Sequence, residues 1–123
     1  MNVSALIIVI IFLVFDIVTG WLQALATNTT NSSIMRKGLF HKLAEILAVC
    51  FGYICEYTFP LTGVTVNIPL AGGIAAYIVV METASIVENL CKLNPTLNAI
   101  MGKFFDEGKL KTVPQEGKHD EKK

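Results

Sequence analysis

The sequence predicts an all-α integral membrane protein with three transmembrane helices, a short C-terminal amphipathic helix and a disordered charged tail. Apolar residues make up 53% of the chain and the mean hydropathy is +0.56, which exceeds what the core of a soluble domain requires. They gather in three long segments, over about residues 3–26, 43–59 and 69–90. All ten basic residues lie outside these segments. We therefore expect one membrane domain, residues 1–102, followed by a charged cytoplasmic tail, residues 106–123.

The first segment, residues 3–26, is about 24 residues long, enough at 1.5 Å per residue to cross a hydrocarbon core of roughly 30 Å. Asp16 lies near its middle, but the many Val, Leu, Ile and Phe residues outweigh the insertion cost of about 3 kcal/mol for one acid. The alternative is a cleaved signal peptide, which Asp16 and the lack of Lys or Arg in the first five residues disfavour. Small and polar residues share the helix face of Asp16: Thr19, Gly20 and Gln23.

The second segment, residues 43–59, is the least secure span. A polar linker, residues 27–33, and a basic amphipathic stretch, residues 34–42, precede it. It has only about 17 residues, and its two acids roughly cancel the insertion free energy of its apolar residues. We expect it to insert because its acidic and small residues form one face that can pack against protein, and we expect Pro60 to end the helix. That face consists of Glu45, Ala48, Gly52 and Glu56.

The third segment, residues 69–90, carries a stripe at heptad spacing on one helix face. The small residues of the stripe let another backbone approach, whereas its carboxyl, hydroxyl and amide require polar partners in hydrocarbon. Asn94 and Pro95 then form a helix start signal, as N-cap and first residue of an amphipathic helix over about residues 95–105. The stripe comprises Ala71, Ala75, Ile78, Glu82, Ser85 and Asn89.

The basic residues set the expected orientation. Positive charge flanks the first loop and the C-terminus, while the N-terminus and the turn at residues 61–68 have none. Cytoplasmic loops carry the excess of Lys and Arg, so three spans place the N-terminus outside and the C-terminus in the cytoplasm. The residues expected to set this topology are Arg36, Lys37, Lys42 and Lys92.

Each predicted span has a face that carries an acid among small or polar residues. These faces can meet in a single three-helix bundle, with the carboxyls protonated or hydrogen-bonded. They can also promote oligomers and line an aqueous lesion, and both arrangements can hold, one before and one after a rearrangement. Because no basic residue is expected within the spans, ionisation of these acids should depend on water access and on pH.

No catalytic, cofactor, metal or nucleic-acid site is predicted, and we do not expect an enzyme. An intramembrane aspartyl protease needs two Asp residues at membrane depth, and Asp16 is the one Asp within the predicted spans. His41 and His119 fall outside the spans, and no Gly-rich phosphate loop is present. Cysteines without CxxC or Cys/His spacing are expected to be packing residues: Cys50, Cys55 and Cys91.

Three blocks of the sequence resemble the phage holin family that includes the toxin-secretion and phage-lysis holins of Gram-positive bacteria and their phages. The blocks are DIVTGWL at residues 16–22, SIMRKGL at residues 33–39 with Lys42, and YIVVMETASIVEN at residues 77–89. Of the Gly and Pro that this family places after the third span, only Pro95 is present. The resemblance implies a protein of the bacterial inner membrane that forms homo-oligomers and opens lesions which release an endolysin or a toxin.

Two alternatives remain open. An antiholin or other regulatory membrane subunit would share nearly all of these sequence features. A small multidrug-type transporter also uses a membrane carboxylate, but such transporters need an even number of spans and a Glu in the first helix, where this chain has Asp16.

Overall fold

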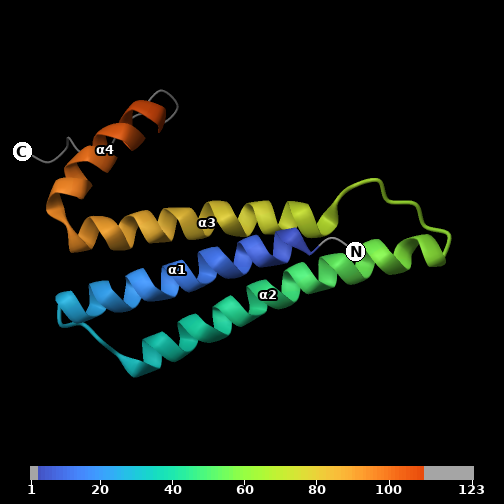
Figure 1. Ribbon diagram of the computed structural model, residues 1–123, viewed down its shortest axis with the longest axis horizontal. Coiled ribbons are helices and arrows are strands. Elements are labelled where there is room, and N and C mark those ends of the chain that lie inside the picture. Colours follow the sequence, from blue (N-terminus) through green and yellow to red (C-terminus); the bar gives the residue numbers. More distant parts are fainter. Residues whose placement is uncertain (1–2, 110–123) are drawn as a thin grey trace, which may run out of the picture.

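The computed structural model describes residues 3–109, which form four α-helices and no strand in that range (Figure 1). Three of the helices are long and apolar enough to cross a membrane, which confirms the predicted fold class. The fourth is the predicted C-terminal helix. The helices are α1 (Ser4–Ala26), α2 (Ser32–Leu61), α3 (Leu70–Leu93) and α4 (Pro95–Lys109).

Consecutive long helices run in opposite directions, so that each is antiparallel to the next (Figure 1). Helix α3 packs closely along α1 and also against α2, whereas α1 and α2 make the fewest contacts. Figure 1 shows α2 diverging from α1 toward the loop that joins them. That loop and α4 lie at one end of the bundle, here called the α4 end. The start of α1 and the loop between α2 and α3 lie at the other, here called the N-terminal end.

Helix α2 is much longer than the predicted span. It begins at Ser32 because Asn31 caps it, with Asn31 Oδ1 accepting hydrogen bonds from the backbone N–H of Ser33 (3.0 Å) and Ile34 (3.3 Å). Pro60 does not end the helix, which continues to Leu61. At 30 residues, α2 includes the basic stretch, residues 34–42, which was predicted to lie outside the span.

The ends of α3 and α4 follow the sequence signals more closely. Pro69 is the N-cap of α3, which continues to Leu93. Helix α4 begins at Pro95, and the backbone N–H of Thr96 donates to Asn94 Oδ1 at 3.0 Å, which confirms Asn94 as a cap. Helix α4 extends to Lys109, beyond the predicted end at residue 105. The rest of the predicted disordered tail, residues 110–123, lies outside the described residues.

The apolar core occupies the half of the bundle near the N-terminal end, and we call it the dry half. Its closest packing is between α2 and α3, where a Cβ atom placed on Gly52 would lie 2.8 Å from Ala71 Cα. Large apolar side chains cover the outside of all three long helices, as lipid contact requires. The buried apolar residues of the dry half are Val9, Leu13, Val49, Ala71, Ala75 and Ile78.

Candidate functional site

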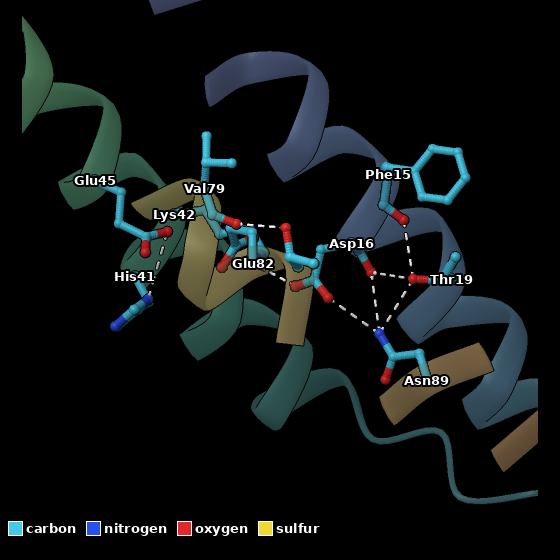
Figure 2. A network of polar contacts seen from close by, with 10 residues as sticks. Phe15, Asp16, Thr19, His41, Lys42, Glu45, Val79, Glu82 and Asn89 are labelled. Atoms are coloured by element: carbon cyan, nitrogen blue, oxygen red, sulfur yellow. Dashed lines mark hydrogen bonds and ion pairs between the residues drawn. The ribbon is translucent and has the colours of Figure 1, made fainter. Parts of the chain in front are cut away.

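An ion-paired cluster joins the three long helices near the middle of the bundle (Figure 2). Asp16 lies at the middle of α1 and Glu82 at the middle of α3. Lys42 of α2 reaches between them, with its Nζ atom 2.7 Å from Asp16 Oδ2 and 2.5 Å from Glu82 Oε2. The three side chains are 14% (Lys42), 10% (Asp16) and 6% (Glu82) exposed, so the ion pairs are largely shielded from the surroundings.

Asn89 completes this central cluster from the next turns of α3. Its Nδ2 atom donates to Asp16 Oδ1 at 3.1 Å and to Thr19 Oγ1 at 3.2 Å, while the Thr19 hydroxyl donates to the carbonyl of Phe15 at 2.9 Å. Gly20 lies beside this amide, and a Cβ atom there would be in ordinary van der Waals contact with Asn89 Nδ2, at 3.4 Å. Both carboxylate oxygens of Asp16 therefore have partners, one from α2 and one from α3. From here on, the central cluster is Asp16, Thr19, Lys42, Glu82 and Asn89.

The position of Lys42 corrects two sequence expectations. Lys42 was expected in the basic stretch that precedes the second span, and no basic residue was expected within the spans to pair with the acids. Instead, Lys42 lies inside α2 and pairs with two of the acids. Its neighbours in the sequence, Arg36 and Lys37, have exposed side chains. The expectation failed because charged residues lower hydropathy, which placed the start of the span after Lys42 rather than before it.

The cluster holds more negative than positive charge. Two carboxylates share one ammonium group, which gives a formal charge of −1 when all three are ionised. A third acid, Glu45, lies one helical turn along α2 from Lys42, and its Oε2 atom is buried without a hydrogen bond and faces His41 Nδ1 at 3.8 Å. Burying a charge carries a desolvation penalty of several kcal/mol per ion. Attraction between the charges offsets this penalty only when they are closely paired and hydrogen-bonded, so the stability of the cluster depends on its geometry.

Glu56 lies apart from the central cluster, at the N-terminal end. Its Oε2 atom accepts a hydrogen bond from the backbone N–H of Ala71 at 2.6 Å. Because the N-cap Pro69 has no acceptor in its side chain, Glu56 of α2 caps α3 across the hairpin. Glu56 was predicted to share a helix face with Glu45, Ala48 and Gly52. Its hydrogen bond with Ala71 was not predicted, because no local motif links the two residues.

The remaining predicted site residues lie around the same helix faces. Ala48 and Ser85 line a groove of about 560 Å³ between α2 and α3, which also contains Glu45 and the acids of the central cluster. Gln23 lies near the α4 end, where its amide donates to Thr27 Oγ1 at 3.2 Å. Lys92 is exposed and lies 3.7 Å from Glu88.

The chemistry of this site is electrostatic. Within residues 3–109, no group of three or more His, Cys, Asp and Glu side chains is arranged to hold a metal ion. What the cluster can do is tie three membrane-crossing helices together while they are shielded from water. Water that reached it would weaken these ties, because ion pairs lose strength as the local dielectric constant rises.

Comparison with known proteins gives one match. The model of the bacteriophage holin family matches residues 2–109, most of the 123-residue chain. No curated protein and no solved structure matches.

Proposed function

The chain belongs to the bacteriophage holin family and is a multi-pass protein of the cytoplasmic membrane, and from this premise we propose that it oligomerises there and opens lesions that release an endolysin or a toxin. The observation that carries the proposal is the central cluster. It places charged and polar groups from all three spans at the middle of the bundle, where hydrocarbon does not tolerate them unpaired. Such groups suit a protein whose helices must later face water.

The single bundle is the closed state in this proposal. Large apolar side chains cover most of the outside of the three long helices and the acids of the central cluster point inward, so isolated copies are compatible with intact lipid. The ion pairs of Lys42 with Asp16 and Glu82 hold α2 against the other two spans. The protein can therefore accumulate without making the membrane leak.

Opening follows from the hydration of these ion pairs. Two unit charges 4 Å apart attract by about 4 kcal/mol at an effective dielectric constant of 20, but by about 1 kcal/mol in water. Water that enters between crowded copies thus releases α2, and each released copy exposes polar faces that admit more water. The change is cooperative, which gives an abrupt onset at a critical density.

The helix faces that meet inside one copy would then face other copies and the water of the lesion. Small residues on these faces allow helices of different copies to approach closely, and the acids and amides are hydrated. We assign this role of assembly and pore lining to Asp16, Thr19, Gly20, Gln23, Glu45, Ala48, Gly52, Glu56, Ala71, Ala75, Glu82, Ser85 and Asn89.

We further propose that the α4 end faces the cytoplasm and the N-terminus faces outward. The exposed cations Arg36, Lys37 and Lys92 all belong to the half of the bundle near the α4 end (Figure 1). The loop between α2 and α3, at the other end, contains no basic residue. An excess of Lys and Arg on the cytoplasmic side favours this orientation.

The function is tested by inducing the chain in a bacterium that carries a cytosolic endolysin without an export signal. We expect abrupt entry of a membrane-impermeant dye, followed by a fall in turbidity that requires the endolysin. The matched control is the same strain with a catalytically dead endolysin, in which dye entry persists and the turbidity fall does not. Stable growth, with the protein verified in the membrane, would contradict the proposal and favour a regulatory subunit.

A further inference from the structure

Two adjoining grooves lead from the α4 end to the central cluster, and together we call them the notch. The inner groove, about 240 Å³, lies between α1 and α2 and has Asp16 and Lys42 in its lining. The outer groove, about 550 Å³, continues to the loop between these helices. The two grooves share Gly20, Ala24 and Met35, so they are continuous. The notch exists because α2 diverges from α1 in this half of the bundle (Figure 1).

Polar groups lie in both grooves of the notch, among apolar side chains such as Trp21 and Leu39. Gln23, Asn31 and Lys92 contribute polar groups to the outer groove, and the central cluster contributes charged groups to the inner one. A water molecule in the liquid occupies about 30 Å³, so the inner groove alone has room for several waters, each of which needs two to four polar partners. The notch therefore has room for water, and polar groups lie in both of its grooves.

The depth in the membrane of the first part of α2, residues 32–42, also favours water in the notch. From Ser32 to Lys42, α2 rises about 15 Å, roughly half the thickness of the hydrocarbon core. Because Lys42 lies level with the middle of α1, this segment crosses the leaflet at the α4 end. Residues 32–41 are all exposed, and Arg36 and Lys37 are among them. Charged side chains at such depth are tolerated where water penetrates or the bilayer thins locally.

We infer that the notch is filled with water in the closed single copy, before any lesion opens. It brings water from the α4 face to the edge of the central cluster at mid-membrane, where the ion pairs stay largely shielded. The dry half blocks passage to the other face. The block consists of tightly packed apolar side chains, among them Val9, Leu13 and Val49. This inference does not depend on whether the chain opens lesions. It implies that only half of the membrane thickness separates the two aqueous phases along the bundle.

Cysteine labelling tests the notch. In a background carrying Cys50→Ala, Cys55→Ala and Cys91→Ala, we compare Gly38→Cys, which lines the notch, with Phe40→Cys, which is exposed on another face of α2 at a similar depth. A second pair on α1 compares Ile17→Cys, which lines the inner groove, with Val18→Cys, which is exposed outside the notch at a similar depth. Cells are harvested while they still exclude dye, and their membrane fragments react with a charged methanethiosulfonate.

We expect labelling about 100-fold faster at both notch positions than at their partners, because the reactive thiolate forms in water and is strongly disfavoured in hydrocarbon. Equal rates within each pair would overturn the inference. Fast labelling that appears only in membranes from cells that already admit dye would also overturn the inference, because the water would then be the water of the lesion. If the chain with all three cysteines replaced does not insert into the membrane, the same substitutions are made in the chain that keeps its native cysteines. Mass spectrometry then measures the extent of labelling at each cysteine separately.

These outcomes are separate from those of the proposed function. A chain that never admits dye but shows the labelling contrast would refute lesion formation and leave the notch in place. If the chain lyses cells but the paired cysteines are labelled at equal rates, lesion formation is supported and the water-filled notch is refuted.

Discussion

Lys42 governs the electrostatics of the bundle, since its ammonium group lies between the carboxylates of Asp16 and Glu82. The acids themselves were predictable, because apolar segments that contain a carboxyl stand out in the sequence. Their partner was not, because the direction of a side chain depends on where the helix begins. A Lys beside the predicted end of an apolar segment is compatible both with a headgroup position and with an inward one.

The ion pair with Lys42 predicts the effect of Asp16→Asn. The substitution leaves one oxygen for two donors, Asn89 Nδ2 and Lys42 Nζ, because the amide nitrogen cannot accept from either. Since removing one partner of a buried pair is destabilising, the closed bundle should lose stability and lysis should begin earlier than in the unmodified chain. Onset of dye entry at equal protein per membrane measures this. Glu88→Gln, on the exposed surface, is the control, and a later onset with Asp16→Asn would contradict the electrostatic account.

The Glu56 contact predicts a loss of stability at the N-terminal end. Glu56→Ala removes the acceptor for the Ala71 N–H and should lower the free energy of unfolding in detergent micelles by about 1 kcal/mol, as for other lost caps. Glu56→Gln retains an oxygen and should cost less. Glu88→Ala is the matched control, because its carboxylate is exposed. If Glu56→Ala and Glu88→Ala had equal effects, the cap would contribute nothing.

At the scale of the helices, the sequence predicted three spans and a fourth helix from hydropathy, periodicity and the Asn94 and Pro95 start signal. It underestimated α2, because the cations before residue 43 and Pro60 near the end both looked like boundaries. Asn31 was the signal that could have placed the start correctly, since its side chain caps the helix from within a polar linker. Pro within the last turn forfeits only one hydrogen bond, so the helix continues past it.

The close approach of α2 and α3 predicts that Gly52→Ala weakens their packing. A Cβ atom at Gly52 meets backbone atoms of Ala71 at 2.8 and 2.9 Å, and backbone cannot move aside as a flexible side chain can. We expect a loss of about 1 to 3 kcal/mol of unfolding free energy, typical of overpacking. Gly73→Ala is the control, because nothing lies within 4 Å of its Cβ position and Ala favours helix. Equal stability of the two variants would show that the contact is not tight.

The C-terminal residues offer a prediction at the same scale. Ending the chain after Lys109 leaves all four described helices whole and removes four Lys and three acidic residues. If these charges tune timing through contact with anionic headgroups, the shortened chain should change the onset of lysis and still admit dye. Measuring the onset of lysis for both chains in cells with raised and with lowered anionic lipid content tests whether headgroup contact is the cause. An onset that does not depend on lipid charge in either chain would contradict it.

At the scale of the whole molecule, the bundle divides into a dry half and an open, polar half. The small-residue stripe of α3 already suggested close packing around Ala71 and Ala75, and the structure buries both. What the sequence could not give is the divergence of α2 from α1, because it depends on three helices packing at once. This division places the central cluster at the boundary between the two halves, where water from one side stops.

The account is tested most directly by the time of lysis onset for Lys42→Met at equal protein per membrane. Removing one partner of a buried pair costs about 3 to 5 kcal/mol, so the closed bundle should lose stability and dye should enter earlier than in the unmodified chain. Lys103→Met, which removes an exposed cation of α4, is the control and should leave the onset unchanged. Adding Asp16→Asn and Glu82→Gln to Lys42→Met removes the unpaired charges and should return the onset toward its original time. An unchanged or later onset for Lys42→Met, with the protein verified in the membrane, would show that the central cluster does not hold the closed state.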